Sequence, residues 1–166
     1  MKDVFARLGT EKRNRILNAA IEEFACKSYE DASTNQIVAA AGIGKGMLFH
    51  YFGSKRELYL DLYQYARKQM DEEVYQRLHY DVSLPQVLKE LARRMVETFR
   101  LYPAITDFIA RCNRETSPEV AEDIARLRKE RGKQLKEDIL GRVLDLEQLK
   151  PNLQRDETRD LIRWVL

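Results

Sequence analysis

The 166-residue chain contains few helix-breaking residues, few cysteines and no long apolar run. Its seven glycines and four prolines leave room for long uninterrupted helices. Cys26 and Cys112 lie far apart and form no C-x-x-C pair, which argues against a disulfide framework or a zinc knuckle. We expect both cysteines to be small packed residues. The longest apolar run, residues 37–44, is far shorter than the roughly 20 residues of a membrane span.

The chain also lacks a strong net charge. A formal charge of +2 is too small to indicate a nucleic-acid partner by itself. Residues 1–56 hold nine Lys/Arg and six Asp/Glu, whereas the remainder has a net charge of −1. This excess lies where a DNA-binding segment needs it, although ordinary scatter explains it as well. Because the N-terminus has no apolar segment of the signal-peptide type, we expect a cytoplasmic protein with no membrane partner.

Helical periodicity runs through almost the whole chain, and no segment alternates with a two-residue period. Apolar residues make up 44% of the chain, enough for a core, so the expected fold class is all-α. We expect a first helix with Thr10 as its N-cap, and the motif Ser117-Pro118-Glu119 as the start of a later one. The longer helices are predicted at residues 10–27, 54–80, 84–102, 104–113, 117–144 and from 157 onward.

Two shorter helices are predicted between the first and second long ones. Ser33 and Gln36 have capping-box spacing, so a helix should begin at residue 34 and stop at Gly42. Gly44 is an acceptable N-cap for a second short helix over residues 45–51. Ser54 and Glu57 form another capping box, which starts the long helix that follows.

This pair of short helices around a glycine-containing turn is typical of a helix-turn-helix. In that motif the second helix enters the major groove of DNA and the first crosses the backbone. Leu48 and Phe52, four residues apart, fit the core side of the second helix. The residues that then point outward form a mixture that suits base edges, thymine methyls and phosphates, namely Lys45, Gly46, Met47, Phe49 and His50.

The segment from Ser33 to Leu58, STNQIVAAAGIGKGMLFHYFGSKREL, resembles the head of the TetR (tetracycline-repressor) family almost position for position. It has that family's Ser/Thr pair, Ala-Gly, Lys-Gly step, aromatic pair and Lys-x-x-Leu. The resemblance covers residues 10–60 and is only architectural beyond them. It implies an N-terminal tri-helical helix-turn-helix domain, here called the head (residues 1–53). A larger helical effector-binding and dimerisation domain, the body (residues 54–166), should follow.

The resemblance also implies which residues contact DNA. They are expected to be Thr34, Lys45, Gly46, Met47, Phe49, His50, Tyr51 and Lys55. Two of them depart from the family pattern, because Met47 stands where Ser or Thr is usual and Phe49 where Tyr is usual. Both changes delete a hydroxyl, so contacts with thymine methyls or readout of DNA shape gain weight over hydrogen bonding.

In the body, the resemblance implies a pocket for a small-molecule effector, which soft and aromatic side chains suggest is apolar or aromatic. The candidate lining residues are Met70, Met95, Phe99, Tyr102, Phe108, Ile109 and Cys112, each of which an ordinary core explains equally well. The family dimerises through its last two long helices. We therefore expect a homodimer. The chain ends inside the first of these two helices, so we also expect its body to be truncated at the C-terminus.

The expected function is that of a repressor released from a palindromic double-stranded DNA operator by this effector. No cofactor or metal is expected. Lys45 is followed by Gly46, which departs from a phosphate-binding loop, and His50 and His79 have no metal-ligand spacing. One alternative is a helical small-molecule-binding protein whose head has lost DNA binding. The other is an enzyme, for which no cluster of acid, base and nucleophile is found.

Overall fold

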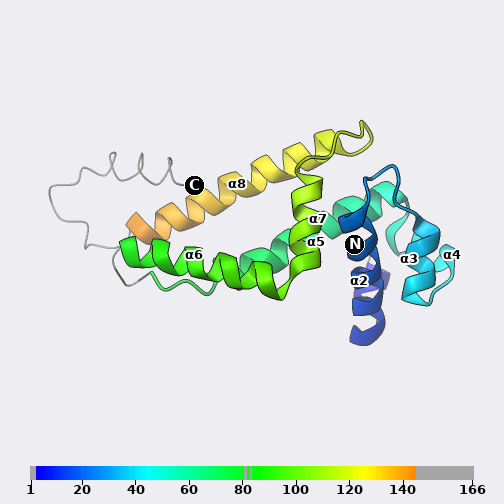
Figure 1. Ribbon diagram of the computed structural model, residues 1–166, viewed down its shortest axis with the longest axis horizontal. Helices are drawn as coiled ribbons and strands as arrows, with labels where there is room; N and C mark the ends of the chain where they lie inside the picture. Colours follow the sequence, from blue (N-terminus) through cyan, green and yellow to red (C-terminus); the bar gives the residue numbers. More distant parts are fainter. Residues whose placement is uncertain (1–2, 81, 83, 145–166) are drawn as a thin grey trace.

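The computed structural model describes residues 3–80, 82 and 84–144, and all regular structure in these residues is α-helical (Figure 1), as the sequence predicts. The helices are α1 (Asp3–Ala6), α2 (Thr10–Cys26), α3 (Thr34–Ala41), α4 (Lys45–Phe52), α5 (Lys55–Val74), α6 (Leu84–Leu101), α7 (Pro103–Cys112) and α8 (Ala121–Leu144). None of these helices is both long enough and apolar enough to cross a membrane.

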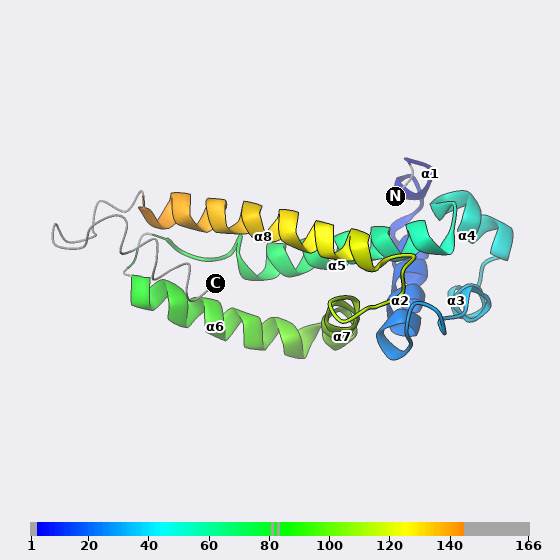
Figure 2. The ribbon, with the colours of Figure 1, turned by 90° about the horizontal axis from the view of Figure 1, so that it is seen from above.

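The molecule is elongated, and a small cluster of helices lies at one of its ends. Helices α2, α3 and α4 make up this cluster, and α5 runs out of it along the body (Figures 1 and 2). Helices α6 and α8 both pack against α5, while α7 crosses at the near end of the body and packs against α2. The body therefore contacts the head both through the continuous helix α5 and through α7.

A cluster of aromatic rings joins these elements. Phe24 of α2 contacts Tyr59 of α5 edge to face, with 4.9 Å between ring centroids, and Tyr59 contacts Phe108 of α7 at 5.5 Å. Tyr29, which follows α2, packs against Tyr59 at 5.2 Å. All four residues are buried. Such pairs add about 0.5–1.5 kcal/mol each beyond the burial of their area, so the cluster fixes α2, α5 and α7 together.

Three helix ends differ from the sequence prediction. Helix α8 begins at Ala121 rather than at residue 117, because residues 118–120 form a turn in which the Ser117 carbonyl accepts from the N–H groups of Val120 (3.1 Å) and Ala121 (2.9 Å). Helix α5 ends at Val74 rather than near Tyr80, because a turn follows in which Leu78 N–H donates to the Tyr75 carbonyl (3.3 Å). The turn places Leu78 in a small core with Val74 and Leu91 of α6. Two apolar residues spaced by four therefore pack in the same core here, although the helix has already ended between them. At α2, the cap is Gly9 and Thr10 is the first helical residue, so the prediction of Thr10 as N-cap was wrong.

The sequence prediction also missed α1, a single helical turn. Its Phe5 is 1% exposed and packs against Phe52 and Tyr51 of α4, with centroid distances of 4.7 and 5.7 Å. One buried side chain gives no periodicity, so only the tertiary contact reveals this element. The helix predicted from residue 157 onward lies outside the described residues.

The two cysteines have opposite environments. Cys112 is buried in the main core, as expected, and burial raises the pKa of its thiol to about 12. Cys26 is exposed at the end of α2, so the prediction that it is packed was wrong. The apolar face of α2 is formed by earlier residues of the helix, which leaves this last position on the solvent side.

Because the thiolate is the reactive form, the native protein should react with a disulfide reagent at Cys26 and not at Cys112. Titration with Ellman's reagent at pH 8 is expected to give one fast thiol in the folded protein and two in denaturant. Cys26→Ser should abolish the fast phase. Equal rates for both thiols in the native protein would contradict this packing.

Candidate nucleic-acid interface

Helix α4 is held by one strongly buried face. Leu48, Tyr51 and Phe52 are 0%, 4% and 1% exposed, and their burial provides most of the stability of this short helix. Phe5 packs against the two aromatic residues from the outside. Tyr51 is one of the eight residues expected to contact DNA. The structure instead places its ring within the core, where it positions α4.

The opposite face of α4 is open to solvent. Lys45, Gly46, Met47 and His50 are exposed, and Phe49 is half-buried beside them. Met47, 38% exposed, and the half-buried Phe49 add apolar surface to a face that also carries Lys45 and His50. The structure thus brings five of the eight predicted DNA-binding residues onto one side of one helix.

Helix α3 is fixed at its start by a cap that draws on two helices. Ser33 is the N-cap, and its hydroxyl accepts a hydrogen bond from Gln36 N–H (3.4 Å). The Ser33 N–H donates to Glu23 of α2 (2.8 Å), which also accepts from Lys27 (2.8 Å). Burial raises the pKa of Glu23, but these hydrogen bonds outweigh it and the net pKa is lowered. The predicted cap is present, with Glu23 as an additional member.

The turn between α3 and α4 depends on Gly42. This residue has φ of 62° and ψ of 42°, a left-handed conformation that costs other L-residues about 1–2 kcal/mol. Gly42 N–H donates to the Ala39 carbonyl and Ile43 N–H to the Val38 carbonyl, the two bonds of a Schellman motif. Helix α2 adds a further tie, because Arg15 Nε donates to the Ala41 carbonyl (2.9 Å). Together these bonds fix the angle between α3 and α4.

The other two predicted DNA contacts lie outside α4. Thr34 is half-buried at the first position of α3, where the helix dipole favours a phosphate. Lys55 begins α5, and its ammonium donates to the Glu30 carbonyl (3.1 Å) and lies 4.9 Å from the centroid of the Tyr29 ring. In this structure Lys55 therefore stabilises the segment after α2 rather than extending into solvent.

A polar junction between head and body was not predicted from the sequence. Tyr29 donates from its hydroxyl to Glu119 (2.7 Å) and from its N–H to Glu115 (2.9 Å), and Arg111 donates to the carbonyl of Ala25 (2.9 Å). Within the body, Arg56 donates to the Glu119 carbonyl (2.9 Å) beside this junction. The partners are 63 to 90 positions apart, so no local pattern in the sequence could have indicated them.

The predicted effector-pocket residues separate into two groups. Met70, Met95, Phe99 and Ile109 line a cavity of about 260 Å³ between α5, α6 and α7. Phe108 and Cys112 are packed in the main core and do not line it. Tyr102 is 38% exposed and also does not line it. A set chosen for soft and aromatic character thus contains residues that face different sides of α7.

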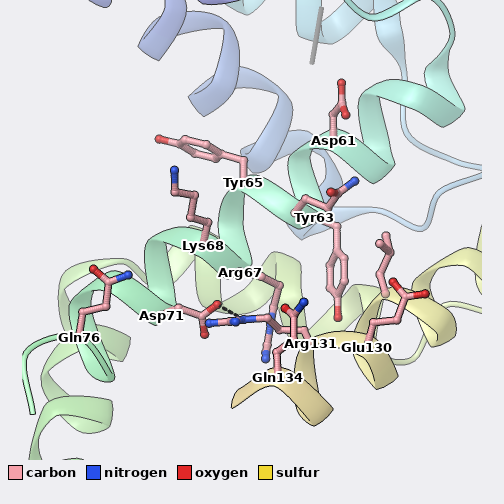
Figure 3. Close-up of a pocket in the computed structure, with 12 residues that line it drawn as sticks. Asp61, Tyr63, Tyr65, Arg67, Lys68, Asp71, Gln76, Glu130, Arg131 and Gln134 are labelled. Carbon is pink, nitrogen blue, oxygen red and sulfur yellow. Dashed lines mark hydrogen bonds and ion pairs between the residues drawn. The ribbon is translucent and has the colours of Figure 1, made fainter. Parts of the chain in front are cut away.

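A second, more open pocket of about 710 Å³ lies between α5 and α8. The residues that line it are mostly polar or charged types, as Figure 3 shows. Among them, Asp71 of α5 is bonded to Arg131 of α8, with 2.5 Å between Oδ2 and Nε. Asp71 is buried and Arg131 partly so. Within the basic stretch 126–133, Arg126 is exposed and pairs with Asp123 and Glu130 of its own helix. Arg131 instead pairs across helices, with Asp71 of α5.

The short helices α3 and α4 are joined by a fixed glycine turn, with α3 packed on α2 and α4 on α5, and they define a helix-turn-helix domain. Residues 16–62 match the family model described as "Bacterial regulatory proteins, tetR family". The helix-turn-helix part of the chain is therefore similar to that of the TetR family.

Two curated relatives illustrate the match. The HTH-type transcriptional repressor AcnR of Corynebacterium glutamicum is 37% identical over 65 residues, which are 39% of this chain and 35% of the relative. The uncharacterized HTH-type transcriptional regulator YvdT of Bacillus subtilis is 33% identical over 101 residues, 61% of this chain and 50% of the relative. The matched segment spans about half or less of the length of the curated relatives.

A solved structure matches the body of this chain as well as its head. The crystal structure of a TetR family transcriptional regulator from Chloroflexus aurantiacus superposes with a TM-score of 0.65 at 24% identity. The superposition covers 99% of this chain and 76% of the other. At this identity the likeness establishes the shared fold of head and body.

The turn makes opposite predictions for two glycines of the interface. Gly42→Ala should lower the free energy of unfolding by about 1–2 kcal/mol, because alanine is strained at positive φ. Gly46→Ala, inside α4, should raise it by up to about 1 kcal/mol. At both glycines an added methyl group would meet no atom within 4 Å, so sterics do not confound the pair. Urea unfolding of both variants measures this, and equal effects would refute the role of Gly42.

The head–body junction predicts a pH dependence. Glu115 accepts from the N–H groups of Tyr29, Thr116 and Ser117. Burial raises the pKa of Glu115, but these bonds outweigh it and lower the pKa below its ordinary value. A lowered folded pKa gives stability that is present above the unfolded pKa of about 4.3 and is lost as pH falls through the folded pKa.

Glu115→Gln should therefore destabilise the protein by about 1 kcal/mol at pH 7, with the difference closing below pH 4. Thermal unfolding from pH 3 to pH 7 measures it. Glu122→Gln, at an exposed position of α8, is the matched control and should change little at any pH. A Glu115→Gln effect that does not depend on pH would count against this account.

Proposed function

We propose that the protein is a sequence-specific DNA-binding transcriptional regulator that acts as a repressor. The observation that carries the proposal is the exposed face of α4, with Lys45, Met47 and His50 held outward by a buried opposite face. A helix in this position of a helix-turn-helix enters the major groove. Lys45 then pairs with phosphate or a guanine edge, and Met47 with thymine methyls.

The proposed contacts beyond α4 are those of the α3 N-terminus and of α5. Thr34 with the first N–H groups of α3 binds a backbone phosphate. Lys55 contacts a second phosphate. Its ammonium then releases the Glu30 carbonyl and donates to the DNA instead. Phe49 and Gly46 allow close approach to the groove floor, and Tyr51 supports α4 from within.

We further propose that two copies bind a palindromic operator, with the head acting as DNA-binding domain and the body as effector and dimerisation domain. Effector binding in the body selects a head spacing that no longer fits two successive major grooves. Helix α5 and the aromatic cluster of Phe24, Tyr59 and Phe108 support this coupling, since they connect body and head through one packed core.

Enrichment from a randomised duplex DNA pool tests the proposal. The expected result is a palindromic consensus whose log affinity falls steeply with log salt concentration. Lys45→Gln should weaken binding and reduce the salt slope by about one unit. Lys129→Gln, which removes an exposed lysine of α8, is the matched control and should leave both unchanged.

A pool that does not enrich, with no salt-dependent binding, would refute the regulator function and favour a protein that binds only small molecules. A single half-site without a palindrome would refute the dimeric mode alone.

A further inference from the structure

The cavity between α5, α6 and α7 is lined mainly by apolar side chains. They are Met70, Val74, Met95, Phe99, Ile109 and Ala110. Its volume of about 260 Å³ is near the lower end of the usual range for small-molecule sites, about 300–1,000 Å³. Phe99 is 42% exposed and lies on its wall, so a bound molecule would cover apolar surface that now meets water.

One charged group on this wall has no counter-ion among the described residues. Arg67 of α5 lines the cavity, and its Nε is buried without a hydrogen-bond partner. Its guanidinium forms no ion pair with any residue that the structure describes. Arginine stays charged at all relevant pH values, and an unpaired buried donor is costly. A partly buried arginine whose Nε has no hydrogen-bond partner among the described residues therefore lies beside an apolar cavity.

The acid nearest to it in the cavity wall is already neutralised. Asp71, one turn further along α5, accepts from Arg131 through Oδ2 at 2.5 Å. Figure 3 draws this pair in the neighbouring pocket between α5 and α8, which Asp71 and Arg67 also line. The Oδ1 of Asp71 is buried and has no partner. The wall thus offers an anion-binding guanidinium and, beside it, one vacant hydrogen-bond acceptor.

We infer that the effector is a small amphipathic carboxylate with an apolar body and a hydrogen-bond donor near its acid group. This inference rests on the proposed function, which supplies the role of an effector. The carboxylate accepts from Arg67, for which a guanidinium offers a paired geometry. The donor bonds to Asp71 Oδ1, and the apolar part lies against Met95, Phe99 and Ile109. An apolar or aromatic effector, as expected from the sequence, satisfies the cavity but leaves both polar groups unpaired.

A matched series of ligands tests this chemistry on the full chain in the absence of DNA. The probes are 4-phenylbutyrate, 2-hydroxy-4-phenylbutyrate, 4-phenylbutanol and 4-phenylbutylamine, which share one apolar body. Dissociation constants come from isothermal titration, and shifts in melting temperature provide a second readout. The two carboxylates should bind at least about tenfold more tightly than the alcohol, and the amine most weakly. The hydroxy acid should bind more tightly than the simple acid.

Arg67→Met tests the residue while preserving length. It should reduce carboxylate affinity about tenfold or more, leave the affinity for the alcohol within about twofold, and not lower the melting temperature of the free protein. Lys68→Met is the control: it removes the same charge from the next, exposed position of α5, which does not line this cavity. It should leave carboxylate affinity unchanged.

Three results would overturn the inference: no measurable binding of either carboxylate at millimolar concentration, tightest binding of the amine, or equal effects of Arg67→Met and Lys68→Met. Because these measurements contain no DNA, they are independent of the regulator function. Carboxylate binding by a protein that enriches no DNA sequence would keep the site and refute the regulator. Enrichment of DNA without carboxylate binding would do the reverse.

Discussion

The packing of Phe24, Tyr59 and Phe108 is the interaction on which the rest of the structure depends. These rings come from α2, α5 and α7, so the same core that supports the helix-turn-helix also anchors the body. Native cores are close-packed, and such packing transmits displacement rather than absorbing it. A shift of α7 or of the first half of α5 must therefore alter the position of α2, on which α3 packs.

The interface on α4 follows from this constraint. A helix of eight residues is unstable alone, and burial of Leu48, Tyr51 and Phe52 is what holds it. Because that face is buried, Lys45, Met47 and His50, which lie on the opposite face, point outward. The fixed turn at Gly42 and the bond from Arg15 to the Ala41 carbonyl then set where the outward face points. Recognition of DNA, as proposed, thus depends on residues that never contact it.

Helix α5 has two different environments along its length. Its first half is buried in the shared core, whereas further along it Arg67 and Asp71 line a cavity bounded by α6 and α7. Asp71 is paired across to α8, and Arg67 is left without a counter-ion among the described residues. A ligand that supplies this counter-ion would bind to the same helix that enters the head.

Local chemistry determined much of this protein from the sequence alone. The capping residues Ser33 and Ser54 and the glycine at position 42 predicted helix ends correctly, because caps and left-handed turns depend on neighbouring residues. The outward set on α4 also followed from helical spacing. Tertiary structure alone decided the burial of Phe5, the turn that ends α5, and the pairing of Asp71 with Arg131. It also decided that Phe108 and Cys112 face the core while Ile109 faces the cavity. These outcomes depend on contacts between residues distant in the sequence, whose geometry no local pattern encodes.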